Sequence, residues 1–318
     1  MKILVTGACG YKGHVLVPKL LNQGHTVVAH DIQWFGNYHA PHPNLTVIKG
    51  DVRNTDSISL NGIDCIMHLA SIANDPCGDL DPKLTWETSA LATMQLADKA
   101  ARSGVKRFIY ASSGSVYGIK QEKDVVEDLE ANPVSEYNKT KMVSERVLLS
   151  YSKDMVVQII RPATVCGLSP RMRLDVAVNT LTIQALTRGE ITVLGGNQIR
   201  PNIHIDDITD VYLHMLSNPN LVGIFNAGFE NISIIDIAEL VKEKIPSIIN
   251  IEPSNDPRSY RINSDKLLST GFKPKKNVQN AIEEIMQAYN RGALVDADNF
   301  YNLRWMQSQN LIKSLSND

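Results

Sequence analysis

The chain of 318 residues has little of several features that would place it in a specialised class of protein. Its four cysteines, Cys9, Cys65, Cys77 and Cys166, lack metal-type spacing, so we expect free thiols, no disulfides and no metal. No apolar run approaches the roughly 20 residues that span a bilayer, so we expect no membrane contact. The net charge of −2 offers no electrostatic basis for binding nucleic acid. The first residues already read as a strand without a targeting segment, which predicts a cytoplasmic protein.

What is present is an ordinary globular composition, with 43% hydrophobic and 21% charged residues. In the first half, short apolar runs alternate with helical patterns, which is typical of βαβ units and a parallel sheet. The expected strands are Lys2–Thr6, Thr26–Asp31, Leu45–Lys49, Cys65–Ala70, Arg107–Ser112 and Val156–Ile160. The expected helices between them are Gly13–Asn22, Pro82–Arg102 and Ser135–Tyr151.

The pattern changes after Arg161-Pro162, where loops rich in Pro, Asn and Gly separate the elements. Four further helices are expected there, near Asp175–Thr187, Asp206–Ser217, Ser233–Lys244 and Val278–Tyr289. We therefore predict an α/β protein: a doubly wound Rossmann domain over 1–162, and a smaller C-terminal α/β substrate lobe formed mainly by 163–318. Some later elements are expected to return to the first domain.

The first strand runs into a glycine-rich turn that opens a helix, with Gly7, Gly10 and Gly13 spaced three apart. Gly7 permits the tight turn, Gly10 lets the backbone approach a pyrophosphate, and Gly13 allows close helix–strand packing. A purely structural turn would have the same pattern. The residues that follow decide between a dinucleotide-binding turn and a purely structural one.

Asp31 ends the second strand about 20 residues beyond the glycines, where a carboxylate can accept hydrogen bonds from the adenosine ribose. The same charge would repel a 2′-phosphate, which favours NAD over NADP. Asp51, after the third strand, can accept from the adenine amino group or be a solvated loop residue. His68, at the end of the fourth strand, is expected to be a packed, hydrogen-bonded histidine rather than a chemical group.

A Tyr and a Lys lie four residues apart at the start of a predicted helix, so Tyr137 and Lys141 share one face. Oxidation of an alcohol removes a hydride and the hydroxyl proton together, which requires a base. A tyrosine has an ordinary pKa near 10. We expect the Lys141 ammonium, together with the positive nicotinamide, to lower it. Ser113, just beyond the fifth strand, can hold the reacting oxygen.

Together these motifs resemble the extended short-chain dehydrogenases/reductases, in the nucleotide-sugar epimerase/dehydratase branch. The likeness runs over nearly the whole chain: the glycine turn, His68-Leu69-Ala70, Ser112 to Gly118, Tyr137 with Lys141, and Arg161-Pro162. It implies catalytic roles for Ser113, Tyr137 and Lys141, with Ser113 also touching the substrate. It further implies that NAD contacts Gly7, Gly10, Tyr11, Lys12, Gly13, Asp31, Asp51, Val52, Leu69, Ala70, Ser71, Tyr137, Lys141 and Pro162.

Departures from the family pattern narrow the expected reaction. Dehydratases of this branch carry an Asp-Glu pair after the catalytic Ser/Thr, and decarboxylases carry an acid at the second following position. This chain has Gly114-Ser115 there, so neither reaction is favoured. Lys12 stands at a commonly apolar position, and Cys166 at a commonly aromatic one. Both departures concern the placement of the substrate rather than of NAD.

Three arginine-bearing loops in the second half resemble the family segments that grip a nucleotide diphosphate. Arginine suits this role because its planar fork donates two hydrogen bonds at once. The residues expected to bind substrate, besides Ser113, are Arg171, Arg173, Asn179, Arg200 and Arg258. Each arginine taken alone would equally be a solvated surface charge.

The leading hypothesis is an NAD-dependent nucleotide-sugar epimerase that oxidises a sugar hydroxyl, at C4 by the family pattern, and reduces the ketone again. The alternative is a net NAD-dependent dehydrogenase or 4-ketoreductase acting on a related sugar, with a GDP-heptose-like substrate as one option. A third hypothesis is a non-catalytic dinucleotide-binding regulator. The family likeness also implies a homodimer, formed through the two long helices of the first half.

Overall fold

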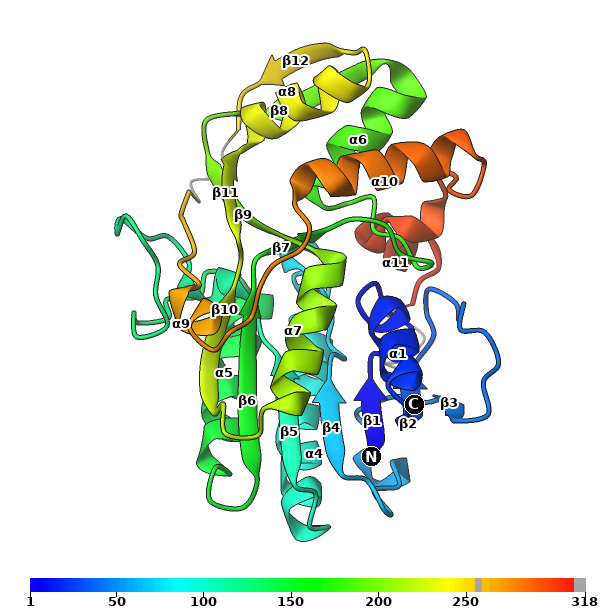
Figure 1. Ribbon diagram of the computed structural model, residues 1–318, viewed down its shortest axis with the longest axis vertical. Helices are drawn as coiled ribbons and strands as arrows, with labels where there is room; N and C mark the ends of the chain where they lie inside the picture. Colours follow the sequence, from blue (N-terminus) through cyan, green and yellow to red (C-terminus); the bar gives the residue numbers. More distant parts are fainter. Residues whose placement is uncertain (255–258, 312–318) are drawn as a thin grey trace.

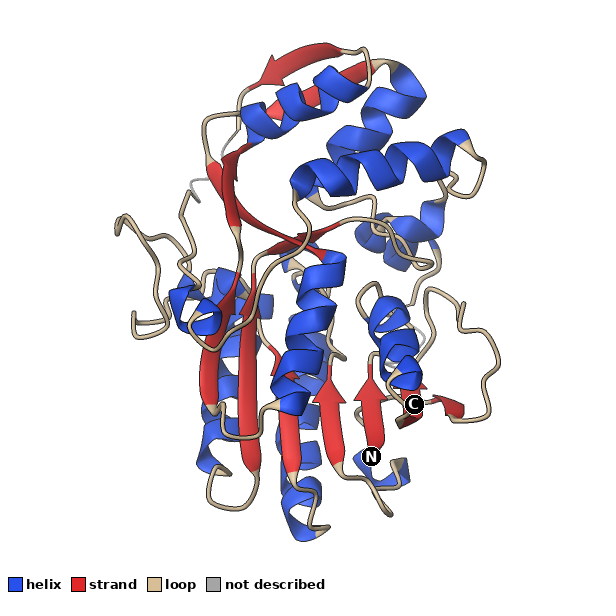
Figure 2. Ribbon diagram, in the orientation of Figure 1, coloured by secondary structure: helices blue, strands red, loops and turns tan. Residues whose placement is uncertain are grey.

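The computed structural model describes residues 1–254 and 259–311, and its larger part is built on a seven-stranded parallel sheet (Figures 1 and 2). Across the sheet, the strands are β10 (Gly223–Ala227), β6 (Val156–Pro162), β5 (Arg107–Ala111), β4 (Cys65–His68), β1 (Lys2–Thr6), β2 (Thr26–Asp31) and β3 (Leu45–Lys49). The chain moves outward from β1 to β3 and then returns to β4 on the other side of β1. This reversal leaves a crevice at the carboxyl ends of β1 and β4, where such sheets bind ligands.

Helices cover both faces of this sheet because successive strand residues point to opposite sides. On one face Ile3 and Val5 of β1 pack with α1 (Gly13–Asn22) and α7 (Ile205–Ser217). On the other, Leu4 packs with α4 (Ala92–Arg102) and α5 (Glu136–Ser150). Figure 1 shows α1 and α7 on the near face, with α4 and α5 behind the strands. The doubly wound Rossmann fold is confirmed.

The predicted helix from Pro82 to Arg102 is one helical run with an irregular middle. It consists of α3 (Pro82–Trp86), a π-helical segment η2 (Glu87–Leu91) and α4. Short π-helical segments often mark functional regions. Here the segment carries Ser89, whose hydroxyl and carbonyl oxygens bond Ile72 N–H and the Ser144 hydroxyl. The segment thereby ties the loop after β4 to α5.

The smaller part of the structure has its own core between helices and short strands. Helices α6 (Ala177–Arg188), α8 (Ile234–Lys244) and α10 (Val278–Asn290) pack together there. They accompany a two-stranded sheet of β12 (Ile248–Glu252) with β8 (Glu190–Leu194), and a three-stranded sheet of β11 (Glu230–Ser233), β9 (Ile199–His204) and β7 (Thr164–Cys166). Figure 2 places this lobe beyond the carboxyl ends of the strands.

Short elements complete the connections between these parts. The 3₁₀ turns are η1 (Thr55–Ser57), η3 (Gly114–Tyr117) and η4 (Asp298–Phe300). The short helices are α2 (Asp75–Gly78), α9 (Asp265–Leu268) and α11 (Asn302–Ser308). Within the described ranges no helix is both long and apolar enough to traverse a bilayer.

Some predicted boundaries and assignments are wrong. The helix predicted at Asp206–Ser217 was assigned to the lobe, but as α7 it packs against α1 and the large sheet. The strand predicted at Val156–Ile160 continues to Pro162, because β10 pairs alongside it and extends the ladder. The strand expected to reach Ala70 ends at His68. β10 and α7, which lie beyond residue 162, join the large sheet and its helices. The division into two domains at residue 162 remains a prediction.

Candidate active site

The glycine turn between β1 and α1 closes around its neighbours so tightly that side chains are excluded. Gly7 has φ +68°, and a Cβ there would lie 2.6 Å from the Ala70 backbone nitrogen. A Cβ on Gly13 would lie 2.2 Å from the Ala8 carbonyl oxygen. No side chain caps the N-terminus of α1; His14 N–H donates to Gly10 O and Val15 N–H to Lys12 O instead. This cradle suits a phosphate, which helix N-termini favour.

Asp31 is held rigidly beside that turn. Its Oδ2 accepts from Cys9 N–H at 2.9 Å, and its Oδ1 accepts from Gln33 N–H at 2.6 Å. Burial raises the pKa of this carboxyl, and the two backbone N–H groups and the nearby Arg171 oppose that rise. A carboxylate oxygen has further lone pairs, so both oxygens can also accept from a ribose.

Asp51 lines the same cavity but is paired with Arg53, whose Nη2 lies 2.8 Å from its Oδ2. Arg53 Nη1 also reaches Glu87 at 3.1 Å. Sequence reasoning missed Arg53, because nothing marks an ion pair between residues two apart in a loop. His68 is the packed residue we expected: it bonds Thr6 and Thr93, and burial lowers its pKa to about 3.

The structure brings nearly all of the predicted residues to one cavity of about 890 Å³ between the sheet and the lobe. The lining residues expected to contact NAD are Gly7, Gly10, Tyr11, Lys12, Gly13, Asp31, Asp51, Val52, Leu69, Ala70, Ser71, Tyr137, Lys141 and Pro162. Trp34 and Phe35, from the loop after β2, also line it. Sequence reasoning missed these two aromatics because no motif surrounds them.

Tyr11 and Lys12 reach the cavity in different ways. The Tyr11 hydroxyl donates to Gly167 O at 2.6 Å, and its carbonyl accepts from Ser169. The Tyr11 side chain therefore links the turn to the second half of the chain, and its hydroxyl has little hydrogen-bonding capacity left for a ligand. Lys12 Nζ lies 3.5 Å from the Tyr212 hydroxyl, and burial beside Arg173 lowers the pKa of Lys12 to about 8.

Tyr137 and Lys141 lie together on α5, as their spacing predicted. The helix starts at Ser135, whose side chain accepts from Asn138 N–H. Lys141 is buried, and its Nζ donates to Ala111 O at 2.7 Å and lies 5.7 Å from the centre of the Tyr137 ring. The carbonyl at the end of β5 thus fixes the ammonium beside the phenol.

Burial shifts the pKa values of both members of this pair. Burial, followed by the charge of Asp75, raises the pKa of Tyr137 to about 12, although Ser113 and Arg173 act in the opposite direction. Burial also moves the pKa of Lys141 well below its ordinary range. In the protein without NAD, burial disfavours both charged forms. The lowering of the tyrosine pKa that we expect also depends on the positive nicotinamide and remains a prediction.

Ser113 belongs to a hydrogen-bonded chain that continues away from the tyrosine. Its hydroxyl lies 2.6 Å from the Ser115 hydroxyl, which donates to Asn138 Oδ1. Asn138 Nδ2 in turn donates to Asp75 Oδ1 at 3.0 Å. Sequence reasoning missed Asn138 and Asp75; the Asn74-Asp75-Pro76 turn after β4 was the available signal. Ser112 has a separate role and donates to the buried Glu145.

Among the substrate-binding residues predicted in the second half of the chain, the three described arginines line the cavity and Asn179 does not. Arg173 and Arg200 line the cavity, and Arg173 Nη2 is buried with no hydrogen-bond partner among the described residues. Arg171 also lines it, but its guanidinium stacks 4.0 Å from the Phe35 ring centre and donates to Asn302 and to the Met172 carbonyl. These contacts engage the Arg171 guanidinium with other residues of the protein.

Asn179 lies behind the cavity wall. Its side-chain oxygen accepts from Gly167 N–H, and its nitrogen donates to Tyr11 and to the Arg173 carbonyl. The residue is fully buried and does not line the cavity, so its expected direct contact with substrate is not supported. Arg258 lies outside the described residues.

A Rossmann sheet, a glycine cradle and a Tyr-Lys pair facing one cavity define a dinucleotide-dependent enzyme of the short-chain dehydrogenase type. The sequence profile of the NAD dependent epimerase/dehydratase family matches residues 3–228. Because this match spans well over half of the chain, the protein belongs to that family.

Relatives share both sequence and architecture. A UDP-glucose 4-epimerase of Lactobacillus helveticus is 27% identical over 314 residues, covering 89% of this chain and 95% of the relative. The uncharacterized UDP-glucose epimerase YtcB of Bacillus subtilis is 31% identical over 264 residues, which cover 76% of this chain and 82% of the relative. The UDP-glucuronic acid 4-epimerase of Bacillus cereus, solved with UDP-glucuronic acid and NAD, superposes with a TM-score of 0.81 at 28% identity, covering 92% and 99%.

Proposed function

We propose that this protein is an NAD-dependent nucleotide-diphosphate-sugar epimerase. It would oxidise one sugar hydroxyl, at C4, to a transient ketone and reduce the ketone from the opposite face. The convergence of Ser113, Tyr137 and Lys141 on the cavity that contains the glycine cradle carries the proposal. The 4-epimerases among its relatives support both the reaction and a nucleotide-sugar substrate.

The lining residues fit NAD. A Cβ would fill the space at Gly7 and Gly13, and the uncapped start of α1 offers N–H groups for the pyrophosphate. We assign Asp31 to the adenosine ribose, and Asp51 with Val52 to the adenine. Leu69, Ala70, Ser71 and Pro162 would form the remaining wall around the cofactor. Bound NAD would supply the hydride acceptor and a positive charge next to the phenol.

Within this site, Tyr137 is the base that removes the hydroxyl proton and returns it in the second half of the reaction. Ser113 lines the same cavity, and its hydroxyl would donate a hydrogen bond to the reacting oxygen. Lys141, anchored on the Ala111 carbonyl, holds its amino group beside the phenol, and it would donate to the cofactor ribose. Burial excludes water, which favours return of the proton to the substrate over its loss to solvent.

The segment after Ser113 supports epimerisation over elimination or decarboxylation. A Cβ on Gly114 would lie 2.4 Å from the Ile262 side chain and 3.1 Å from the Pro162 carbonyl oxygen. An acidic side chain at 114 would therefore require its neighbours to move. At 115, the serine hydroxyl is bonded to Ser113 and Asn138 and provides no acid.

We assign the substrate diphosphate to Arg173 and Arg200, with Arg258 as a further candidate. The buried Arg173 Nη2 is a donor that a phosphate oxygen would satisfy. Arg171 has an indirect role, since its contacts with Phe35 and Asn302 shape the cavity wall.

The test is incubation of the purified protein with UDP, GDP, CDP and dTDP sugars, with the products analysed by NMR. The proposal predicts an epimer pair that reaches the same equilibrium from either side, without accumulation of NADH. Stoichiometric NADH and an oxidised sugar would instead identify the dehydrogenase alternative. Binding of NAD without turnover of any sugar in the panel would favour the regulator.

A homodimer built on the two long helices also remains our proposal. Several large apolar side chains on or beside these helices are exposed: Trp86, Leu91, Met94, Val134 and Leu149. Pairing of two copies through these helices would cover such a surface. A cytoplasmic location likewise remains a prediction.

A further inference from the structure

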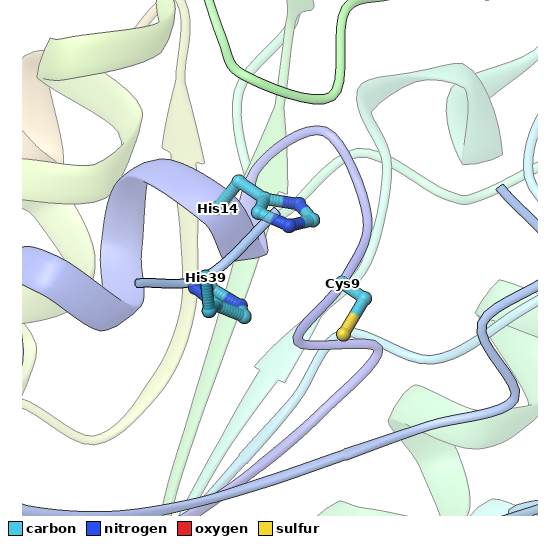
Figure 3. A group of neighbouring side chains, drawn as sticks. All are labelled: Cys9, His14 and His39. Carbon is cyan, nitrogen blue, oxygen red and sulfur yellow. The ribbon is translucent and has the colours of Figure 1, made fainter. Parts of the chain in front are cut away.

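A second cluster of reactive side chains lies at the glycine turn. It contains Cys9 of the turn, His14 of α1 and His39 of the loop that follows β2 (Figure 3). One ligand atom from each residue lies within 4.8 Å of the other two. Cys9 and His14 are buried, and His39 is partly buried. The proposed epimerisation uses none of these side chains.

The hydrogen bonds of the two imidazoles define which nitrogen can bind a ligand. His14 Nδ1 lies 3.1 Å from Gly10 O, and His39 Nε2 lies 2.9 Å from Ala8 O. A carbonyl oxygen only accepts, so these nitrogens carry the protons, and lone pairs remain on His14 Nε2 and His39 Nδ1. Metal-binding histidines commonly donate their second nitrogen to a backbone carbonyl in this way. Burial lowers the pKa of both rings, which favours the neutral, ligating form.

We propose that Cys9, His14 and His39 form a binding site for a borderline-soft divalent transition metal ion, with Zn²⁺ as the best match. One thiolate and two imidazoles are a ligand set that zinc accepts, with a water or another group in the fourth position. Metal binding would displace the Cys9 thiol proton to solvent and form a metal–sulfur bond. Asn37 Oδ1, which lies 3.6 Å from Cys9 Sγ, is a neighbouring oxygen for the fourth position.

Two local features decide how readily the cluster closes on a metal. Bond lengths of about 2.0–2.3 Å require ligand atoms about 3.3–3.6 Å apart in a tetrahedral site, so the cluster must contract slightly. His14 Nε2 must also give up the N–H of Tyr38, which it accepts at 2.9 Å. Because Tyr38 and its neighbours Asn37 and Ala40 are exposed, this loop segment can shift.

Nearby charges both favour and oppose the binding of a cation at this cluster. Burial, followed by the charge of Asp31, raises the pKa of the Cys9 thiol to about 12, whereas the negative charge of Asp31 attracts a cation. The positive charge of the Arg171 guanidinium near His14 repels one. The site would lie directly under the wall of the cofactor cavity, because Cys9 also lines that cavity.

Cobalt and zinc titrations of the full-length protein test this proposal. Co²⁺ bound to a thiolate produces a sulfur-to-metal charge-transfer band, and Zn²⁺ should displace it at one ion per chain. The matched pair of variants is His39→Gln, whose amide can still donate to Ala8 O, and His42→Gln in the same loop. His39→Gln should weaken Zn²⁺ binding by at least about tenfold, whereas His42→Gln should bind as the unaltered protein does.

Cys9→Ser supplies the second readout, because it should abolish the charge-transfer band while the protein still unfolds cooperatively. Absence of that band in the unaltered protein would overturn the proposal. Equal Zn²⁺ affinity of the two histidine variants would also overturn it. Binding that persists with its thiolate band in Cys9→Ser would assign the metal to another cysteine and refute this site.

Discussion

The half of the cavity that we assign to the cofactor is formed largely by backbone groups of one short turn. The half that we assign to the substrate is lined by charged side chains from one loop and from β9. In the first half, Gly7 and Gly13 admit no Cβ, and Asp31 is fixed by two backbone N–H groups. In the second, Arg173 keeps a buried donor unpaired, and Arg171 is drawn into the protein. We therefore expect the first half to accept ligands of one shape, and the residues of the second half to differ between enzymes with different substrates.

The largest effect should come from the residue where the two halves meet. Tyr137→Phe removes the phenolic oxygen but keeps the ring, so turnover should fall by about 10²–10⁴-fold. NAD affinity should change little, because the expected cofactor contacts are otherwise intact. Steady-state kinetics and NAD titration measure both quantities. Tyr151→Phe, at the end of the same helix, is the control, and equal loss in that variant would refute the assignment of Tyr137.

The second-largest effect is expected at Gly7 in the half assigned to the cofactor. A comparison with Gly24 separates steric exclusion from backbone strain. Ala at Gly7 or at Gly24 would be strained, since φ is +68° and +80°. Such strain costs about 1–2 kcal/mol of folding stability. Only at Gly7 would the new Cβ collide, at 2.6 Å from Ala70 N; nothing lies within 4 Å at Gly24. Gly7→Ala should therefore lose NAD binding by calorimetry, and Gly24→Ala should keep it. Equal NAD affinity of the two variants would contradict the cradle.

The substrate half can be tested by separating its two arginines. Arg173→Ala removes a donor to the proposed diphosphate, so substrate KM should rise by about 10–100-fold, as the loss of a charged hydrogen bond implies. Arg171→Met should mainly lower the thermal midpoint, because it breaks contacts to Phe35 and Asn302. If Arg171→Met raises KM more than Arg173→Ala does, these two roles are reversed.

The smallest effect concerns Lys12, the cation at the border of the two halves. Its pKa is lowered to about 8 in the folded protein, below the ordinary lysine value. The unfolded chain therefore binds more protons between about pH 8 and 10.5, so stability should rise with pH in that window. Lys12→Met should flatten this rise in denaturant titrations without NAD. The same pH dependence in both proteins would show that Lys12 does not titrate as described.

The sequence predicted those parts of the site that depend on short-range spacing. Tyr137 and Lys141 are four apart on a helix, and the three glycines belong to one turn. Their placement follows from local geometry alone. Six strands of the Rossmann sheet were likewise predictable from their short apolar runs, whereas β10, which pairs with β6, was not expected.

What the sequence could not predict depends on contacts between distant residues. Asn179 reads as a helix-start residue near two arginines, yet it is bonded to Tyr11, 168 positions away. Nothing in the sequence indicated that burial and Asp75, on another loop, raise the pKa of Tyr137 in the protein without NAD. Because we considered the cysteines only by their spacing from one another, the approach of Cys9 to two histidines was missed.

The central claim is that one cavity oxidises and re-reduces the same carbon of a nucleotide sugar. The most direct test uses the sugar that the panel identifies, carrying deuterium at C4, in ordinary water. The epimeric product should retain the deuterium at C4, and no labelled NADH should leave the protein. Replacement of the label by solvent hydrogen, or its recovery in released NADH, would contradict the proposal.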